Sequence, residues 1–352
     1  MVANDKTKEQ YIETLIKEVH QKSKNYGSVN TVYIGGGTPS SLSLPLLKSL
    51  FKAIKETVDV ENLEEYTIEC NVEDISEELI QVFFDYHINR ISIGIQSFDS
   101  SKLKILGRNH SYLETLGKIK TIREVYNSKV QINIDLMYAV QGETMETLQT
   151  DLDLIMTLRP DHISIYSLIL EERTLLHHQF LKEEYQVFDE DLESEMYFQI
   201  RSYLMNQGYH HYETSNYAKP GCTAKHNLKY WDLETYLGLG AAASNFINNM
   251  RFTNPRNLQK YYDLVNGISE EYAEMEHLLP EDLMKEEIII GLRKVDGISI
   301  ARFYERYQIS IYEKFSIIEV LLEKNWLKEE EGYLKLPTDK LYLANFVLKK
   351  FI

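Results

Sequence analysis

The feature that most constrains the fold is an alternation of short β-branched runs with helical segments over the first half of the chain. Five Val- and Ile-rich runs have the composition of buried strands, at residues 31–34, 66–68, 90–95, 130–134 and 162–168. Apolar residues at helical spacing predict helices at 8–22, 45–58, 112–127 and 144–158, and one more that begins at Ser76. This alternation predicts a parallel α/β sheet covered by helices, either a barrel or a doubly wound sheet.

Each predicted strand ends in glycine or in a polar side chain that a plain core does not need. These residues are the glycines 35–37, Glu69, Gln96, Asp135 with Tyr138, and Tyr166. Any one of them is equally well explained as a loop entry or a helix cap. Five in succession favour one shared site, because barrels gather their functional side chains at the C-terminal ends of the strands.

Composition and charge exclude several classes of function. The formal net charge of −16 over 352 residues opposes the phosphate attraction on which nucleic-acid binding depends. No apolar run has the length of a membrane span, and residues 1–10 lack the apolar core of a signal peptide. Only two cysteines, Cys70 and Cys222, are present and they lie far apart. A disulfide framework is therefore not expected, and we expect a cytoplasmic protein.

The last part of the chain has a different pattern. Helices are expected at 282–293, 299–307 and 311–325, followed by a hairpin near 326–336 and a last helix at 342–351, as in a winged-helix-like domain. Residues 283–352 carry 12 Lys and Arg against 11 Asp and Glu, so no basic face for DNA is expected. We expect three domains: a partial barrel at 1–208, a connecting region at 209–280 and a winged-helix-like domain at 281–352 that serves for packing or for binding a partner.

Eight segments in a fixed order carry a family resemblance. They are Gly35–Pro39, Asn89–Phe98, Leu106–His110, Asp135–Tyr138, Tyr212–Tyr217, Pro220–Gly221, His226–Trp231 and Tyr236–Gly240. Together they resemble the oxygen-independent coproporphyrinogen III oxidases of the radical S-adenosylmethionine (SAM) superfamily, and most closely the HemW-type heme chaperones. The resemblance covers about residues 8–352. It implies a (β/α) barrel, SAM and a [4Fe–4S] cluster as cofactors, and heme and a heme-acceptor protein as partners.

The resemblance also implies the residues of a SAM site. By position, the residues that hold the amino-acid part of SAM are Gly36, Gly37 and Thr38, and the polar contacts are Glu69, Gln96, Arg108 and Asp135. The chemistry is consistent, because acidic groups suit the cationic and hydroxyl parts of SAM and Arg108 presents a planar fork to a carboxylate. For Arg108 the alternative is a surface salt bridge, and for Asp135 a cap at the strand end.

The segment His226–Trp231 resembles the HNxxYW signature that is tied to heme in the chaperones. His226 is the candidate ligand of heme iron, and Tyr230 and Trp231 are candidates for packing on the porphyrin. The alternative is that His226 forms hydrogen bonds in a loop while the two aromatic residues pack beneath it. Cys222 is either a second soft ligand or an inert loop thiol.

Two departures from the family pattern matter. The CxxxCxxC loop that holds the cluster is missing, and Met1 lies where the chain should already be past that loop. Cys70 and Cys222 sit at other motif positions, and strand alternation should turn Cys70 away from the side of Glu69. The turn Ala139–Glu143 replaces the usual Gly-Leu-Pro-Gly-Gln type of turn, which affects the nucleotide side of the site.

These observations lead to three expectations. The fold is an incomplete radical-SAM barrel of five parallel strands, with the strand at 31–34 at an unpaired edge. SAM binds weakly and is not cleaved by this chain, because the cluster has no ligands. The function is that of a heme chaperone, with an oxygen-independent coproporphyrinogen III dehydrogenase and a cluster-free binding module as alternatives.

Overall fold

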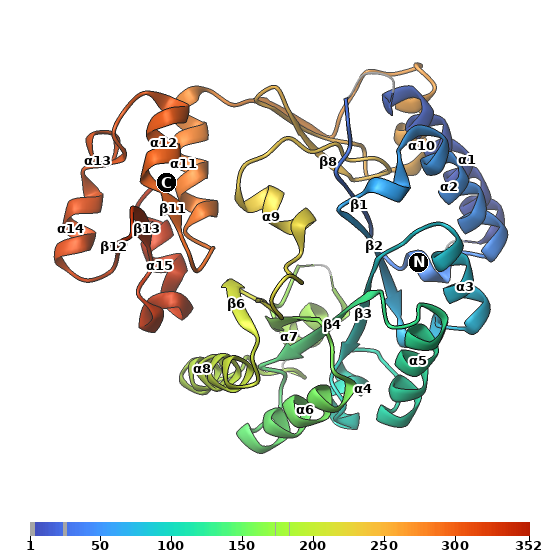
Figure 1. Ribbon diagram of the computed structural model, residues 1–352, viewed down its shortest axis with the longest axis horizontal. Helices are drawn as coiled ribbons and strands as arrows, with labels where there is room; N and C mark the ends of the chain where they lie inside the picture. The colour runs from blue at the N-terminus through green and yellow to red at the C-terminus, as the bar shows by residue number, and fades with distance from the viewer. Residues whose placement is uncertain (1–3, 24–26, 173, 183) are drawn as a thin grey trace. The chain divides into compact units, whose positions relative to one another are not determined.

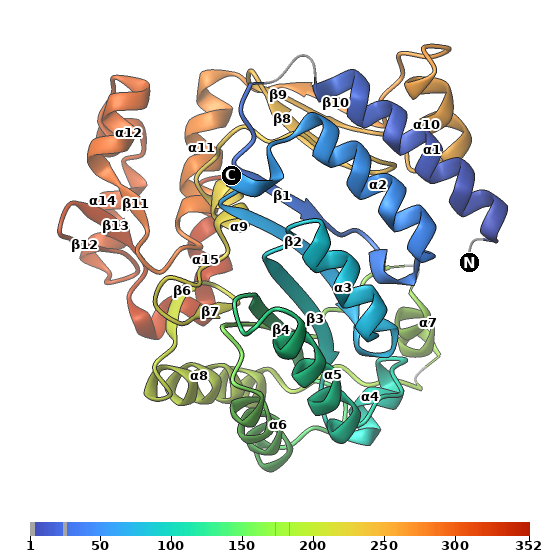
Figure 2. The same cartoon turned by 45° about the vertical axis from the view of Figure 1, so that its right-hand side comes forward.

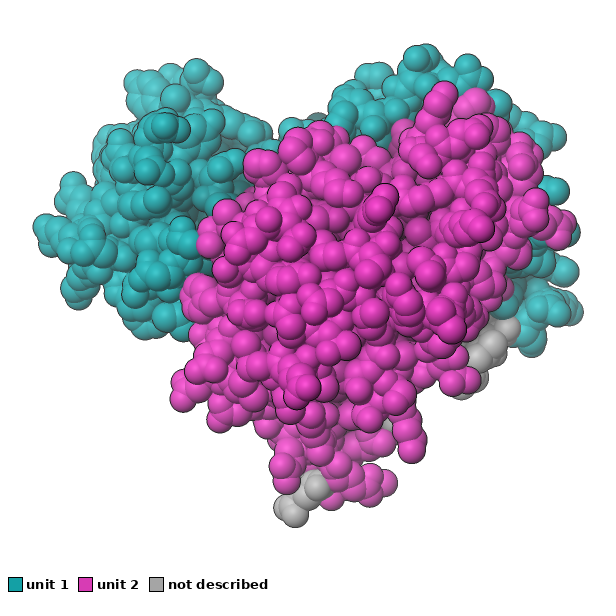
Figure 3. Space-filling model, turned by 60° about the horizontal axis from the view of Figure 1, so that its bottom comes forward, with its two compact units in different colours: residues 1–32, 42–65, 224–352 teal, residues 33–41, 66–223 magenta. Residues whose placement is uncertain are grey.

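The structure is a computed structural model that describes residues 4–352 except 24–26, 173 and 183. The chain divides into two compact units (Figure 3). Unit 1 comprises Met1–Val32, Leu42–Glu65 and Ala224–Ile352, and unit 2 comprises Tyr33–Ser41 and Tyr66–Thr223. Within the described ranges, no helix combines the length and the apolar character needed to cross a membrane.

A seven-stranded sheet forms the centre of the fold. Its strands, in spatial order, are β1 (Thr31–Ile34), β2 (Glu65–Asn71), β3 (Arg90–Gln96), β4 (Gln131–Tyr138), β5 (His162–Ser167), β7 (Asn216–Ala218) and β6 (His210–Glu213). Strands β2 to β5 pair in parallel, and the sheet curls as an open barrel wall (Figure 1). The predicted α/β fold and its five strands are confirmed.

The sheet differs from the expectation at one end. A hairpin of β6 and β7 extends it beyond β5, and both of its pairings are antiparallel. At the opposite end β1 is the edge strand among the described strands, with β2 as its neighbour. The expected edge position of residues 31–34 is therefore confirmed, while the sheet has two strands more than the five that were expected.

Helices cover the outer face of the parallel strands in unit 2 (Figures 1 and 2). They are α3 (Glu77–Asp85), α5 (Tyr112–Val125), α6 (Met145–Leu158) and α8 (Glu190–Asn206), while the short helices α4 (Ser100–Ile105) and α7 (Leu175–Leu181) lie in the segments that follow β3 and β5. Helix α3 begins at Ser76, as predicted, because the Ser76 side chain accepts a hydrogen bond from Leu79 N–H. Strand β3 is buried on both faces, since Ile91, Ile93 and Ile95 on one face are inaccessible to water and Arg90 and Ser92 on the other are 3% and 4% exposed.

Unit 1 contains the two N-terminal helices and the chain from Ala224 to Ile352. Its elements before residue 280 are α1 (Asp5–Lys22), α2 (Leu44–Thr57), α9 (Lys225–Trp231), β8 (Ser244–Ile247), β9 (Met250–Thr253), α10 (Leu258–Val265) and β10 (Glu274–His277). Strands β8, β9 and β10 form an antiparallel sheet. Helix α1 packs on α2 and α10, and its buried Glu18 accepts hydrogen bonds from Gly240 N–H and the Tyr261 hydroxyl.

The C-terminal part of unit 1 contains the predicted helices and hairpin. Its elements are α11 (Pro280–Gly291), β11 (Ile298–Ser299), α12 (Ile300–Tyr307), α13 (Ile311–Lys314), α14 (Ile317–Glu323), β12 (Lys328–Glu330), β13 (Tyr333–Lys335) and α15 (Ala344–Leu348). Strand β11 joins the hairpin in a small antiparallel sheet. The helix expected at 311–325 is broken, because Phe315 adopts a ψ of 78° that no α-helix allows.

Candidate functional site

The glycine turn after β1 brings the backbone close to Glu69 of β2. An added Cβ on Gly35 would lie 2.6 Å from Tyr33 Cε1 and 2.7 Å from Glu69 Cδ, so any other residue would require these side chains to shift. Gly36 and Gly37 have φ values of 82° and 136°, a backbone conformation that glycine adopts without strain. Gly36 N–H donates to Glu69 Oε2 at 3.3 Å. The close contact with Tyr33 and Glu69 therefore favours glycine at position 35. The positive φ values favour glycine at positions 36 and 37, the two glycines that the sequence predicted for the site.

Tyr33 holds the second oxygen of the same carboxylate. Its hydroxyl donates to Glu69 Oε1 at 2.6 Å. Burial, followed by the negative charge of Glu69, raises the pKa of Tyr33 far above its ordinary value, so the phenol remains a donor. Sequence reasoning missed Tyr33. The available signal was its position on β1, two residues before the glycine turn.

Arg108, Gln96 and Thr38 come together around Asn71 and Gly94. Arg108 Nη1 donates to Asn71 Oδ1 at 2.5 Å, and Asn71 Nδ2 lies 3.4 Å from Thr38 Oγ1. A register shift between Gly94 and Gln96 leaves Gln96 with a φ of 71°, a conformation that costs about 1–3 kcal/mol outside glycine. Both the Gln96 amide and the Arg108 guanidinium lie next to Gly94. Asn71 is a further member of the site that the sequence did not reveal.

Asp135 of β4 lies among polar neighbours in the same unit. Its carboxylate accepts hydrogen bonds from Ser92 Oγ at 3.1 Å and from Asn133 Nδ2 at 2.7 Å. Burial raises the pKa of the Asp135 carboxyl to about 6, and the charge of Glu69 contributes to the rise. Asp135 and Glu69 are thus close enough to interact. Glu69 and Asp135, which were expected at strand ends, lie inside β2 (Glu65–Asn71) and β4 (Gln131–Tyr138), because both strands continue further than predicted.

The two cysteines do not provide an iron–sulfur site. Cys70 is buried, and burial raises the pKa of its thiol. Cys222 is partly exposed, and the pKa of its thiol is also raised, chiefly by burial. Cluster ligands are thiolates. In the part of the chain that the structure describes, no three His, Cys, Asp or Glu side chains are grouped to hold a metal ion. The residues present therefore do not fit a [4Fe–4S] cluster.

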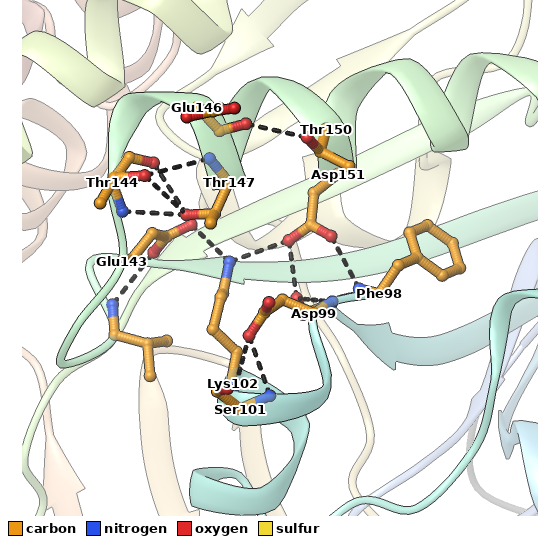
Figure 4. Close-up of polar contacts among 12 residues, drawn as sticks. Phe98, Asp99, Ser101, Lys102, Glu143, Thr144, Glu146, Thr147, Thr150 and Asp151 are labelled. Carbon is orange, nitrogen blue, oxygen red and sulfur yellow. Dashed lines mark hydrogen bonds and ion pairs between the residues drawn. The ribbon is translucent and has the colours of Figure 1, made fainter.

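The unusual turn Ala139–Glu143 is held by a buried ionic network (Figure 4). Lys102 of α4 bonds to Glu143, and its Nζ also lies 2.9 Å from Asp151 Oδ2. Glu143 Oε2 accepts from Val140 N–H at 3.1 Å. Asp151 in turn accepts from the Ser97 hydroxyl and from Phe98 N–H, both at 2.7 Å. The network connects the turn after β3, which follows Gln96, with the turn after β4.

His226, Tyr230 and Trp231 lie in unit 1, on α9. His226 Nδ1 lies 2.8 Å from Thr31 Oγ1, and Nε2 lies 2.9 Å from the Tyr230 hydroxyl. Burial lowers the pKa of His226 to about 4, so its imidazole is neutral at physiological pH. Tyr230 is 40% exposed. Trp231 Nε1 is buried and has no hydrogen-bond partner among the described residues.

Comparison with known proteins agrees with the fold and with the ordered motifs. A family model of the radical SAM superfamily matches residues 2–155, and one of the HemN C-terminal domain matches residues 278–339. The chain is 35% identical to heme chaperone HemW of Lactococcus lactis, over 97% of this chain and 89% of that protein. It is 32% identical to heme chaperone HemW of Bacillus subtilis, over 98% of this chain and 91% of that protein.

A solved structure shows the same fold. The coproporphyrinogen III oxidase HemN of Escherichia coli, a radical SAM enzyme, is similar with a TM-score of 0.84 and 18% sequence identity. The match covers 100% of this chain and 85% of that one. The curled sheet and the C-terminal domain are therefore those of the HemN radical SAM fold.

Proposed function

Because the chain belongs to the HemW heme chaperone family of the radical SAM superfamily, we propose that it binds heme and passes it to an acceptor protein. The observation that carries this proposal is the state of His226. Its imidazole is neutral, as a ligand of heme iron must be, and its Nε2 lies 2.9 Å from the hydroxyl of the half-exposed Tyr230.

Heme binding at this site would replace the hydrogen bond between His226 Nε2 and Tyr230 with a bond between Nε2 and iron. Iron displaces the Tyr230 hydroxyl from His226 Nε2, while the Thr31 hydroxyl continues to bond Nδ1 and orients the ring. Because the pKa of His226 is about 4, no proton has to leave the imidazole at neutral pH. The Tyr230 ring, which already contacts Tyr236 edge to face at 4.7 Å, remains available to pack on the porphyrin.

Unit 2 supplies a second proposed site, for SAM. Glu69 suits the ammonium group and Arg108 the carboxylate of its amino-acid part, at a glycine turn where a Cβ on Gly36 or Gly37 would meet no atom within 4 Å. Gln96, Thr38 and Asp135 supply the remaining polar contacts, with Asp135 accepting from the ribose hydroxyls. Bound SAM would supply a sulfonium group, whose carbon–sulfur bond breaks only when an electron donor reduces it. This chain's own residues bind and orient SAM, and we expect weak binding without cleavage.

The family membership favours the chaperone over the coproporphyrinogen III dehydrogenase. Radical decarboxylation would need the cluster, and the cysteines of this chain do not fit one. Incubation with iron, sulfide, a strong reductant and SAM should therefore yield no 5′-deoxyadenosine. Stoichiometric release of that product would overturn the assignment of unit 2 as a binding site only.

The heme site is tested by titrating heme into the wild-type protein, His226→Ala and Cys222→Ala. We expect a Soret shift in the wild type and in Cys222→Ala, and at least about tenfold weaker binding in His226→Ala, the loss of one metal–ligand bond. The competing hypothesis is that Cys222 or one of the pairs His177/His178 and His210/His211 supplies the ligand, and His177→Ala/His178→Ala and His210→Ala/His211→Ala test the two pairs. An unchanged spectrum and affinity for His226→Ala would exclude this residue as the ligand.

A further inference from the structure

A line of buried side chains leads from Asp135 across the sheet in unit 2. Asn133 Nδ2 donates to Asp135 Oδ1 at 2.7 Å, and His162 Nδ1 lies 2.6 Å from Asn133 Oδ1. At the far end, His162 Nε2 lies 2.7 Å from the Tyr212 hydroxyl. Asn133 is 5% exposed and His162 is 1% exposed, so water does not replace these bonds. None of these three residues was predicted as part of the site.

The neighbours of Asn133 determine the direction of each bond. Asn133 Nδ2 faces Asp135 and also Ser92 Oγ at 2.7 Å, so Oδ1 is the atom that accepts from His162. Burial lowers the pKa of His162 well below its ordinary value, which leaves a neutral imidazole with a single N–H. That proton lies on Nδ1, and Nε2 accepts from the Tyr212 hydroxyl.

A flipped Asn133 amide would place its carbonyl oxygen against the Asp135 carboxylate, which is repulsive. Its NH2 group would face His162 Nδ1, so the imidazole proton would have to move to Nε2 and be donated to the Tyr212 oxygen. The Ser164 hydroxyl also points at Asn133 Oδ1, but at 3.3 Å it is a weaker donor than His162. His162 therefore acts with Asp135 and Ser92 to hold the amide in this orientation, and it is the main donor to Asn133 Oδ1.

We propose that His162 is a positioning residue for Asp135, because it fixes the Asn133 amide that holds the carboxylate ready to accept hydrogen bonds from the ribose of SAM. The arrangement of Asp135 follows from this chain's own contacts. Its consequence for SAM binding rests on the SAM site proposed above.

Two substitutions of His162 distinguish a role in positioning Asp135 from a role in packing alone. In His162→Asn, the amide nitrogen occupies the place of Nδ1 and keeps the donor to Asn133, while the partner of Tyr212 is lost. In His162→Gln, the amide occupies the place of Nε2, so Tyr212 keeps its partner and Asn133 loses its donor. Tyr209→Phe is the control, because it removes another buried tyrosine hydroxyl, bonded to Pro160 C=O at 2.6 Å.

The first readout is the pKa of Asp135, measured by 13C NMR of aspartate carboxyl carbons and assigned with Asp135→Asn. Other titratable groups that act on Asp135 are Glu69 on β2, Tyr33 on β1 and Tyr166 on β5. They are the same in every variant. We expect the pKa of Asp135 to rise by about one unit in His162→Gln, since a donor to the charged form is lost, and to stay near the wild-type value in His162→Asn and Tyr209→Phe.

The second readout is SAM affinity by calorimetry at pH 7.5. We expect it to fall about tenfold in His162→Gln, as for one lost charge-assisted hydrogen bond, and less than about twofold in His162→Asn. Equal pKa values of Asp135 in the two variants would overturn the positioning role. A raised pKa in His162→Gln alone, with no SAM binding by the wild type, would uphold the positioning role and refute the proposed SAM site instead.

Discussion

Removal of the Lys102 ammonium should destabilise unit 2 far more than removal of a surface lysine. The side chains of Lys102, Glu143 and Asp151 are 3%, 0% and 2% exposed, so Lys102→Met would leave two buried carboxylates without a cation. Breaking a buried ion pair by removing one partner costs about 3–5 kcal/mol. That is a large share of the 5–15 kcal/mol by which domains are typically stable.

After removal of the Lys102 ammonium, the carboxylates of Asp151 and Glu143 differ in the hydrogen bonds that they keep. Asp151 keeps hydrogen bonds from the Ser97 hydroxyl and Phe98 N–H, whereas Glu143 keeps only the one from Val140 N–H. Burial already raises the pKa of Glu143, and Lys102 opposes that rise. In Lys102→Met the pKa of Glu143 rises further above its unfolded value. Stability is then lost as pH rises and is recovered on acidification, so the cost should be smaller at pH 5.5 than at pH 7.5.

Both tryptophans, Trp231 and Trp326, belong to unit 1, so their fluorescence does not report on this network. The assay is hydrogen exchange by mass spectrometry of peptides covering residues 97–105 and 139–158, with urea unfolding followed by circular dichroism. The double variant Lys102→Met/Glu143→Gln should recover most of the loss, because it removes one uncompensated charge.

Lys120→Met is the matched surface control. Lys120 and Glu124 lie 3.6 Å apart with side chains 75% and 66% exposed, so the pair contributes less than about 0.5 kcal/mol. If Lys102→Met cost no more than Lys120→Met, or cost the same at both pH values, the reasoning about the buried network would be refuted.

Three further predictions follow from single contacts. Ser76→Ala removes the side-chain cap on Leu79 N–H at the start of α3 and should cost about 1 kcal/mol in urea unfolding by circular dichroism; an unchanged midpoint would contradict this. Tyr230→Phe removes the hydroxyl that competes for His226 Nε2, so heme should bind up to about fivefold more tightly; weaker binding would show that the hydroxyl assists. Because the pKa of His226 is about 4, heme affinity should be constant from pH 8 to about pH 5.5 and fall only below it; a fall that begins near pH 6.5 would indicate an ordinary, exposed histidine.

The parts of the fold that could be predicted are those with a strong local signal. The strand at 90–95 is a run of alternating isoleucines, and it is buried on both faces. Ser76 precedes a helical pattern and caps it. The β6–β7 hairpin could not be predicted in the same way, because His210–Glu213 and Asn216–Ala218 are short and rich in polar residues. The pairing of β7 with β5 depends on contacts between segments distant in sequence.

The residues of the candidate site also divide into those with a local sequence signal and those without one. Glu69 and Asp135 could be proposed from sequence because each is an acidic residue that follows an apolar run and matches a position of the family pattern. Asn133 lies inside such a strand, and nothing in its sequence neighbours indicates that it contacts His162. Lys102 has the sequence context of a surface residue on a short helix, and only the fold shows that it is buried between two carboxylates. Buried polar networks link elements far apart in sequence, so they become visible only in three dimensions.

The central claim is that His226 ligates heme iron, and the ferrous heme complex tests it most directly. Resonance Raman spectra of the wild-type complex should show an iron–imidazole stretching band that shifts when histidine is labelled with 15N and disappears in His226→Ala. In Tyr230→Phe the band should persist, because only the competing hydroxyl is lost. An isotope-sensitive band of unchanged position and intensity in His226→Ala would contradict the claim.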